Sequence, residues 1–200
     1  MKTLICVLFL WPLLASLNVF ALTEEEYSEK LLTAMDERQP AKRLELLETL
    51  AAQGDEYTLF TILNNLAKTA YQAGDLRASE EYSKDLLRLS EKYSDDWNYG
   101  NAIHDGNMVL GLNAVANRDL QLASEFLIKA GSTPGSPQLN SFGPNMTLAS
   151  VLIENGETSA VIRYFDLVGE FWQLERGRLD NWSASAQDGR VPNFGTNLHY

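Results

Sequence analysis

The sequence predicts an all-α fold: a right-handed stack of antiparallel helix hairpins with about eight helices. Apolar residues recur at helical spacing through most of the chain. Helix start and stop signals divide it into segments joined mostly by two- or three-residue turns, and no segment reads convincingly as a strand. The 200 residues are 45% hydrophobic and 22% charged, which is enough for one domain with its own core.

Residues 1–21 differ from the rest of the chain. Lys2 precedes an apolar run from Leu4 to Leu17, and Val19 and Ala21 occupy positions −3 and −1 of a possible cleavage point. This layout predicts a secretory signal peptide, and therefore an exported protein that is periplasmic or secreted. The alternative is an uncleaved membrane anchor, since the segment's length is near the lower limit for a spanning helix.

Cysteine and charge exclude several classes of function. The only cysteine, Cys6, lies in the leader, so the mature chain has no disulfide and no cysteine–metal site. Without Lys2 the chain has 15 basic and 27 acidic residues, a formal charge of −12. Such acidity disfavours nucleic acids and anionic membranes as partners. We expect no metal and no cofactor, and a partner that is another protein or a peptide.

The first half contains four predicted helices. A capping box at Thr23 and Glu26 begins the first, and the proline after Gln39 ends it. Apolar spacing and the turn at Gly74 and Asp75 then define helices at about 41–52, 57–73 and 76–93.

The second half is predicted to hold four more helices, at about 96–116, 120–130, 144–155 and 158–185. An uncharged loop, residues 131–143, separates the second and third of these. The helical domain therefore spans residues 22–186. The remaining segment, 187–200, contains Phe194 and Leu198 among its apolar residues, and we expect it to pack on the domain.

Three hairpins share a pattern. Leu66-Ala67 aligns with Leu110-Gly111 and with Leu148-Ala149, and a turn follows eight residues later in each case. The second helices then begin with Ala78, Ala123 and Val161. Small residues at such positions allow two helices to approach closely.

This pattern resembles the tetratricopeptide repeat, which has a large–small pair at the helix crossing, a Gly-Asp turn and a small residue in the second helix. The chain also resembles uncharacterised bacterial exported proteins with such repeats. The resemblance implies a protein-binding or scaffold module without a catalytic site. It is imperfect, because Ala78 arrives one position early and the units are longer than the usual ~34 residues.

Helix-pair stacks usually curve, and the first helix of each pair lines the concave face. This face would present a mixed apolar and amide surface suited to an extended peptide or a helix. The alternative is that these residues face solvent without a role or lie under the last helix. They are Asn64, Asn65, Lys68, Tyr71, Asp105, Met108, Leu112, Val115, Met146, Ser150 and Ile153.

Two other functions stay open. An enzyme could use His104 and Asp105 together with the 131–143 loop, although adjacent residues on a helix are not expected to face each other.

Leu139 and Phe142 of the 131–143 loop could plug a groove of their own protein. Alternatively, a ligand could be bound by polar groups, namely Gln138, Asn140, Ser141 and Asn145.

The third function is a structural homo-oligomer. It would be joined through Trp97, Tyr99 or the aromatic face of the last helix. The second histidine, His199, has no candidate partner near it in sequence.

Overall fold

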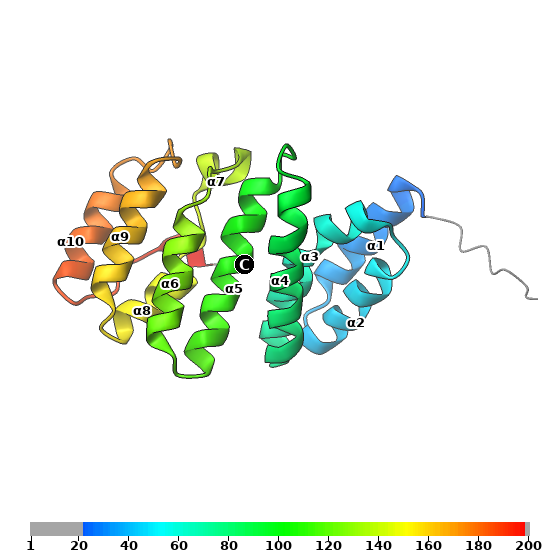
Figure 1. Cartoon of the computed structure of the whole chain (residues 1–200), viewed down its shortest axis with the longest axis horizontal. Coiled ribbons are helices and arrows are strands. Elements are labelled where there is room, and N and C mark those ends of the chain that lie inside the picture. The colour runs from blue at the N-terminus through cyan, green and yellow to red at the C-terminus, as the bar shows by residue number, and fades with distance from the viewer. Residues whose placement is uncertain (1–21, 199–200) are drawn as a thin grey trace, which may run out of the picture.

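The computed structural model describes residues 22–198, which form ten α-helices and one 3₁₀ helix, without a strand (Figure 1). The prediction of an all-α fold is confirmed, and the expected number of about eight helices is wrong. The predicted signal peptide, residues 1–21, lies outside the described residues, as does His199. Within the described range, no helix has the length and apolar character needed to cross a membrane.

The helices of the first half are α1 (Glu24–Asp36), α2 (Pro40–Ala51), α3 (Glu56–Ala73) and α4 (Leu76–Lys92). Those of the second half are α5 (Tyr99–Ala116), α6 (Leu120–Gly131), α7 (Pro137–Phe142), α8 (Thr147–Glu154), α9 (Thr158–Gly169) and α10 (Arg178–Gln187), followed by the 3₁₀ helix η1 (Gly195–Leu198).

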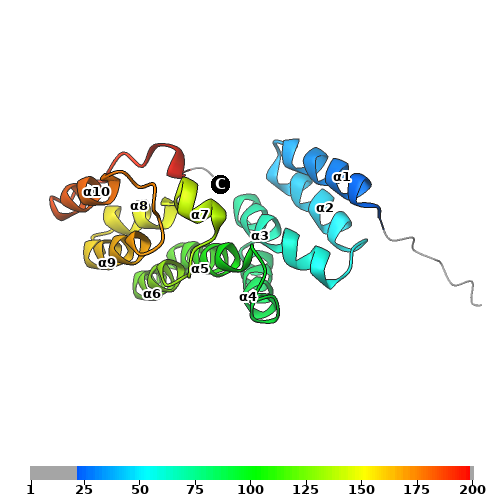
Figure 2. The same ribbon diagram turned by 90° about the horizontal axis from the view of Figure 1, so that it is seen from above.

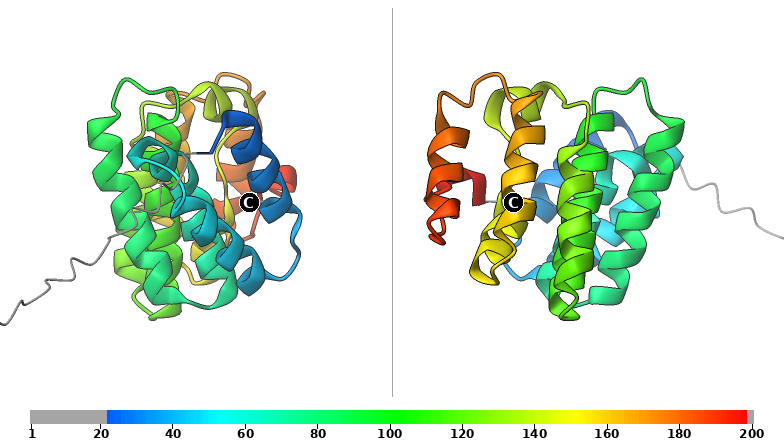
Figure 3. Two further views of the ribbon diagram at one scale, coloured as in Figure 1. Left: turned by 90° about the vertical axis from the view of Figure 1, so that its right-hand side faces the viewer. Right: turned by 60° about the vertical axis from the view of Figure 1, so that its left-hand side comes forward.

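The helices follow one another along the long axis of the molecule. Each of the helices α1 to α5 packs against the next helix, and α6 packs against α8 and α9. Figure 2 shows α3, α5 and α8 on an inner side and α4, α6 and α9 on the outer side. The end of the chain returns to the inner side, next to α5. Figure 3 shows the second-half helices standing side by side.

Three of the turns between paired helices have the same geometry. Gly74, Arg118 and Gly156 each adopt a positive φ, between 63° and 86°. The next residue then donates its backbone N–H to a carbonyl five residues back, at 2.9 Å in all three turns. These hydrogen bonds satisfy carbonyls that the end of a helix leaves unpaired. The three hairpins aligned from the sequence therefore share a real local structure.

The alignment of the first hairpin needs a correction by one residue. Ala123 and Val161 are fully buried, but Ala78 is only half-buried, and Ser79 occupies the buried position instead. The Ser79 hydroxyl accepts a hydrogen bond from the Asn113 amide of α5, at 3.1 Å. A hydroxyl can replace an alanine there because the neighbouring helix supplies its partner.

Two predicted elements are interrupted. The expected helix 158–185 is divided into α9 and α10, because Arg176 and Gly177 both have a positive φ and turn the chain between them. The expected loop 131–143 contains α7, which Ser136 caps by accepting from the Leu139 N–H. Pro144 does not begin a helix, since α8 starts at Thr147.

The core consists of two clusters of different composition. The cluster of the first half is rich in leucine and extends from Ala34 to Ala102. The second cluster, between Met108 and Phe194, includes the aromatic residues Tyr164, Phe165, Trp172 and Trp182. Helices α5 and α8 approach closely within it. A Cβ at Gly111 would lie 2.2 Å from Leu148 Cδ2, so a larger residue there would force the buried Leu148 side chain to shift.

Candidate functional site

A groove on the inner side of the molecule runs between α3 and α5, and we call it the α3–α5 groove. It contains two hollows. One, of about 350 Å³, is lined mainly by amide and carboxylate side chains, and the other, of about 210 Å³, is more apolar. The first is lined by Thr61, Asn64, Asn65, Trp97, Asn98, Asn101, Asp105 and Gln138, and the second by Lys68, Tyr71, Gln72, Val109, Leu112, Thr147 and Leu198.

A salt bridge stands between the two hollows. The Lys68 ammonium lies 2.6 Å from the Asp105 carboxylate, and both side chains are mostly buried. The Asn64 amide also approaches this carboxylate, at 3.5 Å. Burial acts to raise the pKa of the Asp105 carboxyl, but Lys68 and His104 outweigh it and hold that pKa well below its usual range. Asp105 is therefore a fixed negative charge at physiological pH.

Behind Asp105, a chain of polar contacts leads into the core. His104 Nδ1 lies 3.1 Å from the Asp105 carboxylate, and Nε2 lies 3.2 Å from the Tyr164 hydroxyl. That hydroxyl donates to the Asn145 carbonyl at 3.2 Å. We call these residues, with Lys68, the Asp105 network. The expectation that His104 and Asp105 would not face each other is wrong, because the His104 ring lies between the Asp105 carboxylate and the Tyr164 hydroxyl.

The Asp105 network lies mostly out of reach of a ligand. His104 is 1% exposed and Tyr164 is fully buried. Burial, followed by the charge of Asp105, raises the pKa of Tyr164, so its hydroxyl keeps its proton. Only the Lys68 and Asp105 end borders the groove. The network therefore joins α3, α5, α9 and the segment before α8, and it holds the groove wall in position.

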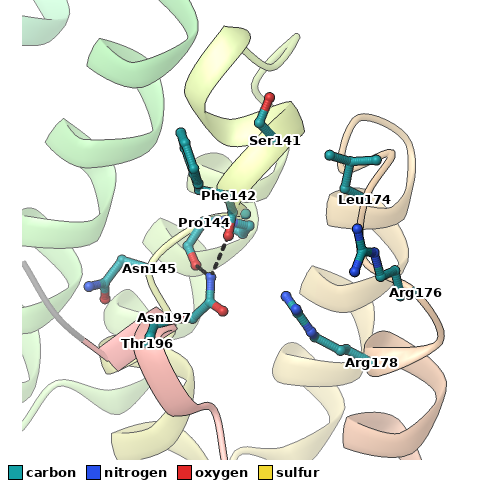
Figure 4. A pocket seen from close by; sticks show the side chains of 10 residues that line it. Ser141, Phe142, Pro144, Asn145, Leu174, Arg176, Arg178, Thr196 and Asn197 are labelled. Atoms are coloured by element: carbon teal, nitrogen blue, oxygen red, sulfur yellow. Dashed lines mark hydrogen bonds between the residues drawn. The ribbon is translucent and has the colours of Figure 1, made fainter.

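The end of the chain occupies part of the groove. The Met146 N–H donates to the Asn197 carbonyl at 2.7 Å, and the Thr147 hydroxyl donates to the Leu198 carbonyl at 3.4 Å. The Asn197 amide donates to the carbonyls of Phe142 and Pro144 at 3.1 and 3.0 Å (Figure 4). We call residues 188–198 the C-terminal tail. Its last described side chain, Leu198, forms part of the wall of the apolar hollow.

The predicted groove residues fall into two groups. Asn64, Asn65, Lys68, Tyr71 and Asp105 do line the hollows. Leu112 lines the apolar hollow at its floor, 3% exposed, and the half-buried Val115 packs against the second core cluster. The expectation that Met108, Met146 and Ile153 face the groove is wrong, because these side chains are buried in the second core cluster.

Some residues of the polar segment around α7 are buried, and others are exposed. Leu139 is buried, whereas Phe142 is 76% exposed. The Asn140 amide, with its nitrogen toward α9, reaches the carbonyls of Ser136 and Phe171 and fastens α7 in place. Asn145 accepts from the Thr147 N–H at 2.7 Å and starts α8. Phe142 and Asn145 also border a separate cavity beside the C-terminal tail.

Sequence reasoning missed several residues of the groove. Gln72 and Thr147 line it only because α3 and α8 meet across α5, a contact that spacing along the chain does not reveal. Asn98 and Asn101 were missed as well, although a run of amides beside the exposed Trp97 is a usable signal of a polar site. From the sequence, Trp97 is predicted only as a residue of an oligomer interface.

Among residues 22–198, no group of three or more histidine or acidic side chains is placed to hold a metal ion. Comparisons with protein family models, with curated proteins and with solved structures found no match to this chain.

Proposed function

We propose that the chain is an exported, tetratricopeptide-like helical module that binds an extended peptide segment of another protein in the α3–α5 groove. The observation that carries the proposal is the way in which the domain binds the C-terminal tail. Residues 197 and 198 lie beside the start of α8, where one backbone hydrogen bond from Met146 and one side-chain hydrogen bond from Thr147 hold them. These two residues end the 3₁₀ helix η1, so the domain holds a short segment of chain through its carbonyl groups, and the same donors can bind the carbonyls of another peptide.

The composition of the groove supports the same ligand class. An extended peptide needs partners for its backbone amides and a place for an occasional apolar side chain. The amide-rich hollow offers Asn65, Asn101 and Gln138 for the first need. The hollow that Leu198 borders offers Tyr71 and Leu112 for the second.

The placement of His104 favours a binding module over the enzyme alternative. A general base must come within hydrogen-bond reach of the proton that it removes. Both nitrogens of the His104 ring already contact protein groups, and the ring is buried. The homo-oligomer alternative has weaker support, since Trp97 borders the polar hollow and Tyr99 is half-buried.

A displayed library of random peptides tests this function. We expect sequences with an apolar residue among polar ones to be enriched. Replacing Asn65 and Gln72 with alanine should weaken their binding at least tenfold, whereas Gln121→Ala on the outer helix α6 should leave it unchanged. Equal loss in both variants, or no enrichment above an unrelated acidic protein, would contradict the proposal. Light scattering of the same samples tests the homo-oligomer alternative, which requires more than a monomer.

Export is a separate part of the proposal and has a separate test. The chain would be expressed with its leader in a bacterial host, and the mass of the protein recovered from the envelope fraction measured. We expect a product that begins at residue 22. A full-length product held in the membrane would favour the uncleaved anchor instead.

A further inference from the structure

A second cavity lies at the other side of the C-terminal tail, away from the groove hollows. It measures about 530 Å³, within the usual range for sites that hold small molecules. Figure 4 shows its walls: the end of α7 and the segment after it, the turn before α10, and the tail. The cavity is lined by Ser141, Phe142, Gly143, Pro144, Asn145, Leu174, Arg176, Arg178, Thr196 and Asn197.

The charge of this cavity is opposite to that of the chain. The protein has 27 acidic and 16 basic residues, yet the cavity is lined by two arginines and no acid. Within residues 22–198, neither Arg176 nor Arg178 forms a salt bridge. The neighbouring Glu175 carboxylate accepts the Leu179 N–H at 3.1 Å, and the charge of Arg178 contributes to lowering the Glu175 pKa. Glu175 does not line the cavity, so the donors that do line it favour an anion.

The turn that carries the two arginines has an uncommon backbone. Arg176 adopts φ 56° and Gly177 adopts φ 76°, so a non-glycine residue is held in the left-handed region. This turn carries both side chains on the same side of the loop, and Figure 4 shows them extending toward Asn197. A pair of guanidinium groups can bind a carboxylate through several hydrogen bonds at once.

An unsatisfied donor adjoins the same cavity. The Trp172 side chain is 1% exposed, and its indole N–H has no hydrogen-bond partner among the described residues. Its ring lies against two cavity residues. The Arg178 guanidinium is 5.3 Å from the ring centroid, and a Cβ at Gly143 would lie 2.4 Å from the ring carbon bonded to the indole nitrogen. The nitrogen is itself buried, and Trp172 is not among the residues that line the cavity, so its N–H reports on the adjoining wall and is not a ligand contact.

One part of the wall is apolar and exposed. Phe142 and Leu174 are among the large hydrophobic side chains most open to solvent, at 76% and 49% exposure. Pro144 lies beside Phe142 in the wall. Covering such side chains removes apolar surface from water, which favours binding of an apolar group.

We infer that this cavity binds a small organic carboxylate with an aromatic or branched aliphatic body. Its carboxylate lies between Arg176 and Arg178, and its apolar body lies against Phe142 and Leu174. This cavity is separate from the α3–α5 groove. An experiment can therefore contradict the proposed carboxylate site without contradicting the proposed peptide site, and the reverse also holds.

Titration of the ¹⁵N-labelled chain with phenylacetate, followed by NMR, tests this inference. We expect saturable shifts that include the Trp172 indole N–H. Phenylacetamide has the same shape without the charge, and acetate has the charge without the ring, and each should bind at least tenfold more weakly. Failure of the Trp172 resonance to move, or equal affinity for phenylacetate and phenylacetamide, would overturn the inference.

Variants give a second test. The double variant Arg176→Gln, Arg178→Gln should bind phenylacetate at least tenfold more weakly, and Arg163→Gln, an exposed arginine of α9, should bind as the wild type does. If the double variant does not fold, Phe142→Ser serves instead, since this exposed side chain can be changed without disturbing the core, and we expect severalfold weaker binding. Wild-type affinity in a folded double variant, or in Phe142→Ser where that variant serves, would refute the site.

Discussion

The two halves of the molecule are built from different side chains. Residues 22–99 carry 17 acidic and 9 basic residues, and their helices pair leucine-rich inner faces with ion pairs such as Lys84–Glu80 and Arg88–Asp85 on the surface. Residues 130–153 carry no charge, and the second half is held by aromatic packing around Phe165 and Trp182. Regular amphipathic helices stabilise the first half, whereas large rings and the C-terminal tail stabilise the second.

The Asp105 network lies at the junction of these halves. It connects Lys68 of the first half with Tyr164 of the second through two residues of α5. The buried charges therefore lie at the junction between the two halves and not inside either half. Four changes test this description, from the largest expected effect to the smallest.

The largest effect should come from removing one buried ring in each half. Phe60→Ala and Phe165→Ala each delete a side chain that is at most 2% exposed, and each should lower the free energy of unfolding by about 3–5 kcal/mol. Because α4 and α5 pack together extensively, we expect one transition in urea. Circular dichroism and tryptophan fluorescence should report the same midpoint in each variant. Separate midpoints in Phe60→Ala would mean that the halves unfold independently.

Asp105→Asn should have the next largest effect, because it removes the buried charge that Lys68 and His104 share. We expect a loss of about 1–3 kcal/mol at pH 7. The pKa of Asp105 is lower in the folded chain, so its contribution to stability is complete above the unfolded-state pKa and is lost as pH falls toward the folded-state value. Urea unfolding between pH 7 and pH 3 should therefore bring the variant and the wild type closer together in acid.

Asp85→Asn is the matched control for that change, since Asp85 pairs with Arg88 on the exposed face of α4. It should change stability at pH 7 by no more than about 0.5 kcal/mol. A difference between Asp105→Asn and the wild type that stays constant down to pH 3 would contradict the assigned role of Asp105.

Arg118→Gly should stabilise the protein slightly. Arg118 holds the left-handed position that glycine holds in the two matching turns, and relief of this strain should raise the free energy of unfolding by about 0.5–1 kcal/mol. Gly156→Ala should act in the opposite direction by a similar amount. Thermal unfolding measures the change in stability of both variants. If both variants are stabilised, or both are destabilised, the turns are not equivalent.

The smallest effect should come from Lys84→Ala, which removes an exposed ion pair with Glu80. We expect a change in stability of less than about 0.5 kcal/mol, because solvent screens such pairs. Urea unfolding in low and high salt measures it. A loss above about 1 kcal/mol would mean that this pair is not screened as an exposed ion pair should be.

Sequence reasoning succeeded where local signals mark each boundary. The capping box at Thr23 and Glu26 is present as predicted, and Asp75 and Asp119 cap α4 and α6. These features depend on a few neighbouring residues. The all-α fold and the shared turns could therefore be predicted from the sequence alone.

Sequence reasoning failed where tertiary contacts override the local spacing of residues. The uncharged segment lacks the polar face that marks an amphipathic helix, so the sequence predicts a loop where α7 lies. The break before α10 depends on the conformation of Arg176, which has no propensity for a left-handed turn. His104 and Asp105 were separated by a rule for isolated helices, whereas α3 and α9 supply the partners that draw both side chains together.

The seat of the C-terminal tail has a thermodynamic consequence for any outside ligand of the groove. The tail is tethered to the domain, so it competes as an intramolecular ligand at a high effective concentration. If it occupies the apolar hollow about 99% of the time, an outside peptide that needs this hollow binds roughly a hundredfold more weakly than it binds the vacated groove. For the peptide binding proposed above, the tail would therefore set an affinity threshold, because a peptide that uses the whole groove has to displace Leu198.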